Sequence, residues 1–409
     1  MIVSGMKILV INCGSSTAKF QVIETAPSAD QDHNLASGLV DRIGRHSVCT
    51  FARAGGEVER KEVSIQNHEE AIEQFVEWLD SNQGSGLGAR QLEAVGHRVV
   101  HGGETFTSAV RIDDDGVAKI ELFNELAPLH NPAAVSGIRA ARKILGSSIP
   151  MVAAFDTSFH HTIPAEAATY AIPWELSKKH RIRRYGFHGL AHQYSAWRYG
   201  QLTGTPSDKI DVVTLHLGNG CSAAAIRGGK SVDTSMGFTP LEGLVMGTRS
   251  GDLDPALISY LARKEGATAA EVENWLNQRS GLLGVSGRSS DMRDLVAAYD
   301  EDPRCRLAVE IFCYRARKYI GAYLAALGGA DAVVFSGGIG EKAPFIRESI
   351  CTGMNWCGIR LDPDKNVSLD GRDGTISPAD SAIQLYVIHT DEEAIIARET
   401  ASLVSAARG

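Results

Sequence analysis

Three times in this chain, a run of apolar residues typical of a buried strand ends in glycine. The clearest case is Val212–Ala225, where alternating apolar residues lead into Gly218–Gly220 and then into small residues. Asn-Gly turns join two strands in a tight hairpin, so an ordinary hairpin would explain this stretch alone. The pattern recurs at Ile8–Phe20, which contains Gly14, and at Ala332–Lys342. Three such turns predict a phosphate-bearing ligand held from several sides, because glycine lets backbone N–H groups approach an anion.

The common nucleotide-binding motifs do not accompany these turns. None of them matches the Walker pattern GxxxxGK[ST], and none gives GxGxxG at the start of a strand–helix–strand unit. A P-loop fold or a dinucleotide-binding fold is therefore not the first choice. The prediction is a nucleotide gripped by glycine turns from well-separated parts of the chain.

Length and charge limit the class of protein. A chain of 409 residues is too long for one ordinary core, so we expect two domains. The net charge of −8 and the pI of about 5.9 argue against a nucleic-acid partner. No apolar run reaches the length of a membrane span, and no signal peptide is recognisable, which predicts a cytoplasmic protein. The seven cysteines lack CxxC pairs and are expected to be buried and reduced.

Hydrophobic periodicity predicts the order of the elements. Expected strands lie at 7–13, 19–25, 35–43, 47–53, 57–65 and 384–388, with the central hairpin at 211–227. Expected helices lie at 68–80, 132–145, 190–200, 255–264, 269–278, 291–299, 303–327 and 343–353, and a last one runs to about 405. The segment Asp233–Pro255 is Gly-rich and without period, so we expect a long functional loop.

Basic residues on loops and carboxylates at strand ends suit phosphoryl transfer. Arg98, His188 and Arg249 follow or interrupt apolar segments, and Asp156 and Glu392 stand at strand ends. Cations and a metal ion neutralise the charge that spreads over a transferred phosphoryl group. Two simpler interpretations remain open. Arg98 would also suit an edge strand with a surface carboxylate partner, and Asp156 would also suit a helix or turn cap.

The order of the motifs is similar to that of the acetokinase family along nearly the whole chain. The matching segments are Leu9–Lys19, His97–Gly103, His130–Pro132, Phe155–His161, Tyr185–Gly189, His216–Gly220, Thr239–Asp254, Asp291–Arg293, Phe335–Glu341 and Thr390–Glu393. The resemblance implies an α/β fold of two duplicated actin-like (ribonuclease H-like) domains with a nucleotide cleft between them. It places one domain at 1–156 plus 392–409 and the other, nucleotide-binding, at 157–391.

The resemblance also implies roles for individual residues. The catalytic residues would be Arg98, Asp156, His188 and Arg249. Asn12 and Glu392 would bind Mg²⁺, with Mn²⁺ as the alternative. Acetate would contact Arg98, Val100, Leu129, His130, Phe187 and Pro240, four of which form an apolar pocket for its methyl group. ATP would contact Lys19, His216, Leu217, Gly218, Asn219, Gly220, Asp291, Met292, Arg293, Gly338, Ile339, Gly340, Glu341 and Lys342.

The implied reaction is direct in-line transfer from ATP to acetate, which gives ADP and acetyl phosphate. The acetate carboxylate is already a nucleophile, so no strong base is required. Lys342 stands where the family often has Asn, and Met292 where Phe or Met occurs, so the base preference is open. A third departure is Ala223, where a larger aliphatic residue is more usual.

Other functions stay open at this stage. A propionate or butyrate kinase is the nearest alternative, because one methylene in an apolar pocket changes binding by only about 1–3 kcal/mol. A sugar kinase would need more polar groups for hydroxyls, and an ATP-driven binding module would need a partner surface. The family resemblance further implies a homodimer.

Overall fold

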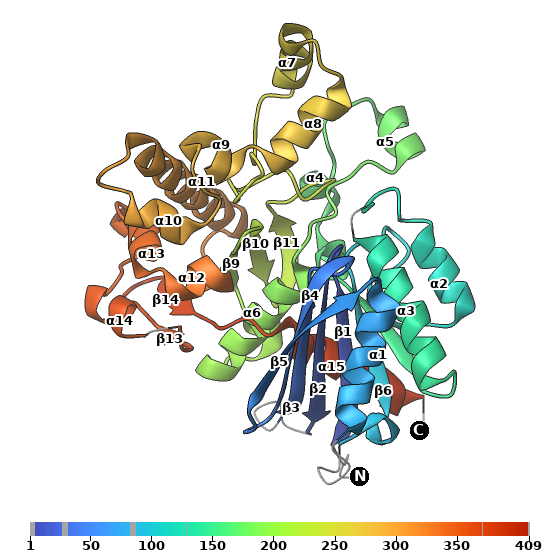
Figure 1. Ribbon diagram of the computed structural model, residues 1–409. Coiled ribbons are helices and arrows are strands. Elements are labelled where there is room, and N and C mark those ends of the chain that lie inside the picture. The colour runs from blue at the N-terminus through green and yellow to red at the C-terminus, as the bar shows by residue number, and fades with distance from the viewer. Residues whose placement is uncertain (1–4, 27–31, 82–86, 129, 370, 408–409) are drawn as a thin grey trace. The chain divides into compact units, whose positions relative to one another are not determined.

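Residues 5–26, 32–81, 87–128, 130–369 and 371–407 are described by the computed structural model of this chain (Figure 1). They divide into two compact units. Unit 1 comprises the described residues of Met1–Ser158 and Asp391–Gly409, and unit 2 comprises those of Phe159–Thr390. Each unit has its own sheet and its own core, as expected for a chain too long to share one.

The sheet of unit 1 has the order β5-β4-β3-β2-β1-β6-β8-β7. Strands β1 to β5 form an antiparallel meander, β6 and β8 continue the sheet in parallel to β1, and β7 pairs antiparallel with β8. The elements of unit 1 are β1 Met6–Cys13, β2 Thr17–Thr25, β3 His33–Asp41, β4 Arg45–Arg53, β5 Val58–Ile65, α1 His68–Asp80, β6 Ala94–Val99, β7 Val110–Arg111, α2 Asp114–Glu121, α3 Asn131–Leu145, β8 Met151–Phe155 and α15 Glu392–Ala406.

Helices cover both faces of this sheet. On one face, α1 and α3 lie against the sheet (Figure 1). Leu9 and Ile11 of β1 share a core cluster with apolar side chains of these two helices. On the other face lies α15, because a Cβ at Gly96 of β6 would stand 2.7 Å from Ile396 and Thr400. A larger side chain at Gly96 would push this helix away from the strands. The C-terminal helix therefore belongs to the sheet of unit 1, although all of unit 2, Phe159–Thr390, lies between this helix and β8 in the sequence.

The sheet of unit 2 has the order β11-β10-β9-β12-β14-β13. Side chains of α6 form a core cluster with alternate residues of β9, β10 and β12. The elements of unit 2 are α4 Ala165–Ala168, α5 Trp174–His180, α6 Gly189–Thr203, β9 Val212–Leu217, β10 Cys221–Arg227, β11 Lys230–Thr234, α7 Ala256–Glu265, α8 Ala269–Gln278, α9 Gly281–Ser286, α10 Met292–Ala297, α11 Pro303–Leu327, β12 Ala332–Ser336, α12 Gly337–Lys342, α13 Pro344–Cys351, α14 Pro363–Ser368, β13 Gly374–Thr375 and β14 Gln384–Val387.

The two sheets repeat one topology. In unit 1, β3-β2-β1 are antiparallel and β1-β6-β8 are parallel; in unit 2, β11-β10-β9 and β9-β12-β14 repeat this order. Both sheets also carry a short antiparallel strand beside the last parallel one. The expected duplicated α/β fold is present in the topology, which sequence periodicity alone does not reveal.

Most predicted elements are confirmed, and the third glycine turn is the main exception. The helix at 68–80 and the helix at 303–327 have the predicted bounds, since Asn67 and Asp302 cap them. Residues 235–255 contain no helix or strand, as predicted for the long loop. The predicted turn at 337–340, however, is helical and forms most of α12. The sequence analysis also did not place α2, α5 and α9.

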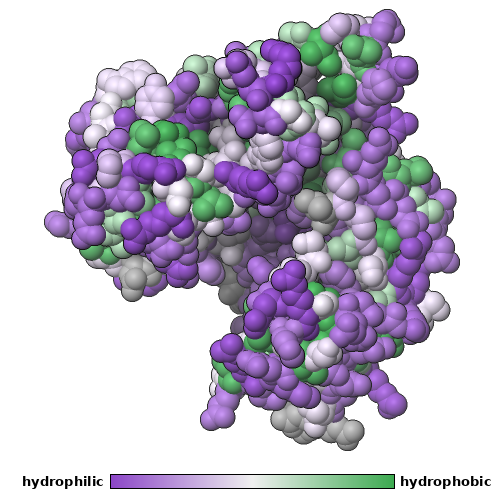
Figure 2. All heavy atoms as spheres, turned by 45° about the horizontal axis from the view of Figure 1, so that its top comes forward, coloured by the Kyte–Doolittle hydropathy of each residue, from purple (hydrophilic) through white to green (hydrophobic). Residues whose placement is uncertain are grey.

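The outer surface agrees with the composition. Figure 2 shows a face on which hydrophilic residues predominate and hydrophobic residues form separate areas. Among the described residues, no helix is both long enough and apolar enough to cross a membrane.

Gly337 is required where β12 passes into α12. Its φ is +73°, and a Cβ there would lie 2.7 Å from the carbonyl oxygen of Leu217. We predict that Gly337→Ala lowers the free energy of unfolding by about 1–3 kcal/mol, the range for one strained backbone position. The measurement is urea denaturation followed by circular dichroism.

Gly338→Ala is the matched control for this prediction. Gly338 is exposed and helical, and a Cβ there would meet no atom within 4 Å. Alanine should be neutral or slightly stabilising at this position, since its helix propensity exceeds that of glycine. Equal losses in the two variants would contradict the account of Gly337.

Candidate active site

In unit 1, the carboxyl ends of three parallel strands bring polar side chains to one edge of the sheet. Asn12 lies near the end of β1, Arg98 near the end of β6, and Asp156 directly after β8. The register pairs Ile11 with His97 and Arg98 with Ala154, so the carboxyl ends of these strands lie at the same level of the sheet. Ligand sites in α/β sheets lie at such edges.

Arg98 links the polar groups at this edge. Its Nε and Nη2 donate to the two carboxylate oxygens of Asp156 at 2.9 and 2.6 Å. Nη1 lies 3.5 Å from Oδ1 of Asn12, and Nε lies 3.6 Å from Oε2 of Glu392, the first residue of α15. The structure therefore brings together Asn12, Arg98, Asp156 and Glu392, which come from four separate segments of the sequence.

The electrostatic balance at this edge is negative. The side chain of Asp156 is 1% exposed and that of Arg98 is 20% exposed. Burial alone would lower the pKa of Arg98, but Asp156, Glu392 and Glu393 raise it above its ordinary value. Three carboxylates near one guanidinium leave a negative charge, so this edge favours a cation.

Both simpler interpretations of these residues are wrong. Arg98 does not lie on an edge strand, because β6 pairs with β1 on one side and with β8 on the other. Its partner Asp156 is buried rather than on the surface. The carboxylate of Asp156 is engaged by Arg98 through both oxygens and does not serve as a helix cap. A buried bidentate pair holds both groups in one geometry.

The loop after β6 is fixed by two buried side chains. Asn131 accepts from the backbone N–H of His101 at 3.0 Å and donates to its carbonyl at 2.9 Å. Thr157 accepts from the backbone N–H of Gly102 at 3.0 Å. Val100 lies half-buried at the start of this loop, and His130 is the N-cap residue of α3. Leu129, another predicted acetate contact, lies outside the described residues.

In unit 2, the predicted hairpin forms and carries basic side chains beside its turn. Strands β9 and β10 pair from Leu217 and Cys221 outward. A Cβ at Gly220 would lie 3.2 Å from the His188 ring and 3.7 Å from Nη1 of Arg249. Glycine therefore leaves room between the turn and these two side chains. His188 itself has a φ of 55°, a left-handed conformation that is uncommon for a residue other than glycine.

Arg249 brings a positive charge to this turn. Its Nη1 donates to the carbonyl of Pro240 at 3.3 Å, and no ion pair with a carboxylate forms within the described residues. Burial lowers the pKa of Arg249, yet arginine stays protonated in proteins. A partly buried arginine beside glycine backbone is a place where an anion would be stabilised.

The third glycine segment packs on the same hairpin. Gly337 lies against the backbone of Leu217 and donates its N–H to Oγ1 of Thr390 at 3.3 Å. The carboxylate of Glu341 accepts from the backbone of Thr390 at 3.1 Å and bonds Nδ1 of His389 at 2.7 Å. Glu341 is thus buried and joins α12 to the end of β14, rather than presenting its carboxylate outward.

Other predicted ATP residues differ in their surroundings. Asp291 caps α10 and pairs with exposed Arg293 at 2.6 Å, which lowers the pKa of Asp291 to about 2. Leu217 and Met292 are core residues, so only their backbone remains for a ligand. Lys19 and Lys342 are exposed, and Lys19 pairs in register with Asn12 on the neighbouring strand. Asn219 lies against Gly247 of the long loop.

The basic segment 181–193 has internal anionic partners. Arg184 pairs with Glu242 at 2.6 Å and lies 3.9 Å from Asp233, so its charge is satisfied within unit 2. Burial alone would lower the pKa of Arg184, but Glu242 and Tyr170 raise it above its ordinary value. Two other basic residues of this segment contact the glycine hairpin: His188 lies beside Gly220 at its turn, and His192 contacts Thr214 and Ser222 on its strands.

The sequence analysis missed the polar residues behind His188. Ser222, His192 and Thr214 are each 0% exposed, and hydrogen bonds connect them to the His188 ring. The spacing of His188 and His192, one helical turn apart on α6, is the signal that could have predicted this contact.

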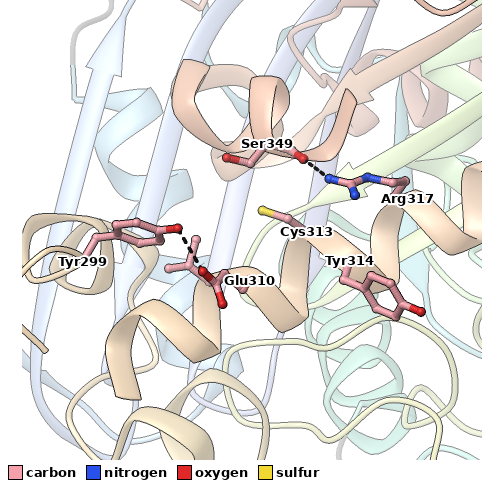
Figure 3. Close-up of a pocket in the computed structure, with 7 residues that line it drawn as sticks. Tyr299, Glu310, Cys313, Tyr314, Arg317 and Ser349 are labelled. Carbon is pink, nitrogen blue, oxygen red and sulfur yellow. Dashed lines mark hydrogen bonds between the residues drawn. The ribbon is translucent and has the colours of Figure 1, made fainter. Parts of the chain in front are cut away.

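A pocket of about 250 Å³ in unit 2 includes none of the predicted site residues (Figure 3). Its charged groups already have protein partners. Tyr299 donates to Glu310 at 3.3 Å, and Arg317 donates to the carbonyls of Ser349 and Ile350 in the last turn of α13. Arg317 thereby serves as a cap for that helix.

Comparisons with known proteins agree on one family. The model of the Acetokinase family matches residues 7–398. A protein of Chloroherpeton thalassium named acetate kinase is 51% identical, over 97% of this chain and 98% of the relative. The crystal structure of Porphyromonas gingivalis acetate kinase has a TM-score of 0.91 at 41% identity, over 98% of this chain and all of that one. A propionate kinase from Francisella tularensis has a TM-score of 0.89 at 40% identity, over 97% of this chain and all of that one.

His97, next to Arg98 on β6, generates a prediction about acid stability. It is 2% exposed, its Nε2 has no hydrogen-bond partner in the described part of the chain, and burial lowers its pKa to about 3. In the unfolded chain, this histidine binds a proton near pH 6.5. Its contribution to the free energy of unfolding is therefore fully present above that pH and is lost as the pH drops towards 3. We predict that His97→Leu reduces the loss of unfolding free energy between pH 7.5 and pH 5 by about 2 kcal/mol.

The measurement is urea denaturation of both proteins at the two pH values. The other titrating groups are common to both chains, so the difference between the two losses isolates His97. Identical losses in the wild type and in His97→Leu would contradict the neutral, buried state of this histidine.

Proposed function

This chain belongs to the acetokinase family, and we propose that it transfers the γ-phosphoryl group of ATP to acetate, giving ADP and acetyl phosphate. The similarity over nearly the whole chain to proteins named acetate kinase carries this proposal. ATP as a substrate and a divalent metal follow from the family. In the reaction, an acetate oxygen forms a bond to the γ-phosphorus, and the bond from that phosphorus to the bridging oxygen of ADP breaks.

Residues of unit 1 would orient the acid and a metal ion. Arg98 is proposed to bind the carboxylate and phosphoryl oxygens, and Asp156 to hold its guanidinium fork in place. What supports this is the bidentate geometry, at 2.9 and 2.6 Å, and the burial of Asp156. A guanidinium fixed in advance loses little freedom when the substrate binds. No proton has to move, because acetate is ionised at neutral pH.

The donors at the same edge fit a hard divalent cation. Amide and carboxylate oxygens are the ligands that Mg²⁺ prefers, and the edge is negative overall. No group of three or more His, Cys, Asp or Glu side chains suited to a metal occurs within the described residues. Mg²⁺ characteristically takes few protein ligands and keeps waters or substrate phosphates. We propose Asn12 and Glu392 as its protein ligands, with Mn²⁺ as a substitute. When bound, the cation would neutralise phosphate charge.

Residues of unit 2 would hold the phosphates and the nucleoside. Arg249 and His188 are proposed to stabilise the transferred group, and the backbone of Gly218–Gly220 to approach the phosphates. What supports this is the unpaired charge of Arg249 within the described chain and its closeness to Gly220. The segments Asp291–Arg293 and Gly338–Lys342, with His216, are proposed contacts of ATP, and Lys19 of unit 1 is a further proposed contact. For Leu217, Met292 and Glu341 the proposal concerns the backbone.

Propionate is the second candidate substrate. The favouring observation is the solved structure of a propionate kinase with a TM-score of 0.89. The acyl contacts expected from the family resemblance, among them Val100, Phe187 and Pro240, stay a proposal. So do the homodimer, a cytoplasmic location, and the domain limits 1–156 with 392–409 and 157–391.

The testing experiment is an acyl hydroxamate assay with ATP and Mg²⁺ and with acetate, propionate or butyrate as acceptor. The preferred acid is expected to be acetate, and EDTA is expected to abolish turnover until Mg²⁺ or Mn²⁺ is returned. A higher kcat/KM for propionate would assign the second candidate. ATP hydrolysis that no added acid accelerates would reject both kinases in favour of a binding module.

The two proposed catalytic arginines give a mutational prediction. Arg98→Ala and Arg249→Ala should each lower kcat by at least about 100-fold, the range for removing a preorganised charge at the transition state. Arg98→Lys keeps the positive charge beside buried Asp156 but loses the fork, so it tests geometry without leaving an unpaired buried carboxylate.

Exposed arginines of the same units are the controls for that assay. The side chain of Arg139 is 60% exposed and pairs with Glu121, and that of Arg360 is 42% exposed and pairs with Asp380. Alanine at either position should leave kcat within about twofold, because surface ion pairs contribute little. Near-normal turnover in a folded Arg98→Ala or Arg249→Ala variant would reject the role of that arginine.

A further inference from the structure

Three buried polar side chains lie behind His188, and the proposed chemistry does not use them. Ser222 of β10, His192 of α6 and Thr214 of β9 are each 0% exposed. Buried polar groups cost free energy unless they are hydrogen-bonded. Their contacts therefore indicate how their protons are distributed.

These side chains form a single series of hydrogen bonds that ends at His188. Oγ1 of Thr214 lies 2.7 Å from Nδ1 of His192, and Nε2 of His192 lies 2.8 Å from Oγ of Ser222. Oγ of Ser222 lies 2.9 Å from Nδ1 of His188. All three distances are within the normal range for hydrogen bonds. Each of these side chains contacts the next one, and within the described residues Thr214, His192 and Ser222 make no other side-chain hydrogen bonds through the atoms named.

The direction in which each hydrogen bond is donated follows from the number of protons that each group carries. A threonine hydroxyl carries one proton, and the only acceptor for Thr214 among the described residues is Nδ1 of His192. A buried hydroxyl without an acceptor is unfavourable, so Thr214 donates and Nδ1 of His192 accepts. A neutral imidazole then carries its proton on Nε2, which donates to Ser222. Burial, together with the nearby rings of His160 and His216, lowers the pKa of His192 and keeps it neutral.

The single proton of Ser222 then has one remaining acceptor. Its oxygen receives the proton of His192, so its own hydroxyl points to Nδ1 of His188. His188 must accept at Nδ1, and a neutral imidazole that accepts there carries its proton on Nε2. Nε2 is the nitrogen on the side of Gly220, at 3.3 Å from the Cβ that this glycine lacks.

We propose that Thr214, His192 and Ser222 are positioning residues that hold neutral His188 with its proton on Nε2, so that this nitrogen donates a hydrogen bond without needing a positive charge. The catalytic consequence rests on the proposed function, in which His188 stabilises the transferred phosphoryl group. Arg249 beside Gly220 supplies the charge, and His188 supplies a directed donor.

The other groups around His188 agree with a neutral ring. The His216 ring of β9 lies with its centroid 4.9 Å from that of His188, and Arg249 lies beside the same glycine. The thiol of Cys221 has a pKa raised to about 12 by burial, so it contributes no negative charge. Ser336 contacts His216 at 3.4 Å. None of these four groups is a carboxylate.

A direct test observes the tautomers in the whole protein without measuring activity. The nitrogen chemical shifts of selectively ¹⁵N-histidine-labelled protein, assigned with His188→Gln and His192→Gln variants, distinguish protonated from unprotonated ring nitrogens. At pH 8 we expect unprotonated Nδ1 and protonated Nε2 in both His188 and His192. A His188 ring protonated on Nδ1 at that pH would overturn the proposal.

A kinetic test compares Thr214→Val with Thr214→Ser. Valine keeps the shape and loses the hydroxyl, whereas serine keeps the hydroxyl and loses a methyl group. Because neutral His188 would then be free to change tautomer, we expect kcat of the valine variant at pH 8 to fall about five- to tenfold, which corresponds to one hydrogen bond. KM values for ATP and acetate should change by less than about twofold. The serine variant should behave as the wild type.

The pH profile separates positioning from a merely structural role. At a lower pH where the nitrogen shifts show His188 to be protonated, the imidazolium carries protons on both nitrogens, so the deficit of Thr214→Val should shrink to less than about twofold. Ser222→Ala should give the same profile. Equal losses at both pH values, or equal losses in the valine and serine variants, would overturn the proposal. If the wild type lacks acetate-dependent turnover, the proposed function fails, and the nitrogen shifts still decide the tautomer.

Discussion

Parallel pairing of the central strands determines where the chemistry of each unit can lie. In unit 1, β1, β6 and β8 end at the same edge, and there Arg98 bridges Asp156, Asn12 and Glu392. In unit 2, β9, β12 and β14 end in step, and their ends carry His216, Ser336 and the segment before Thr390. Backbone hydrogen bonds cannot slip by one residue without exchanging the two faces of every strand, so these polar groups are held in register.

The two edges differ in charge, which matches different parts of a phosphoryl transfer. Near Arg98, three carboxylates outnumber one guanidinium, an arrangement suited to a divalent cation. Near Gly220, Arg249 has no carboxylate partner in the described residues, an arrangement suited to phosphate oxygens. Carboxylate and amide oxygens suit a divalent cation, whereas arginine and backbone N–H groups suit phosphate oxygens.

Buried hydrogen bonds determine how the functional side chains are presented. Asp156 uses both oxygens to orient Arg98, Asn131 fixes the loop that follows it, and Ser222 contacts His188. None of these contacts makes a large contribution to stability by itself, since a neutral hydrogen bond contributes about 1 kcal/mol. Their effect is geometric, because each one excludes alternative rotamers or tautomers of a group that would meet the substrate.

Much of the fold and many site residues could be predicted from local sequence. The helix at 68–80 and the helix at 303–327 follow from caps and periodicity, and the hairpin around Gly218–Gly220 follows from its Asn-Gly turn. The order of motifs identified the family, and through it Arg98, Asp156, Asn12 and Glu392. These signals are readable because they depend on residues adjacent in the chain.

The features that only the tertiary structure determined depend on contacts between residues far apart in the sequence. Strand order placed Arg98 in the interior of its sheet rather than at an edge, and close contact with the backbone of Leu217 explains why glycine is required at position 337. Local sequence selected Ser222 only as a small residue, whereas the packing of α6 against β9 and β10 makes it the link between two histidines. Periodicity and caps report on neighbours within a turn or two, but burial and hydrogen-bond partners depend on which strands and helices pack together.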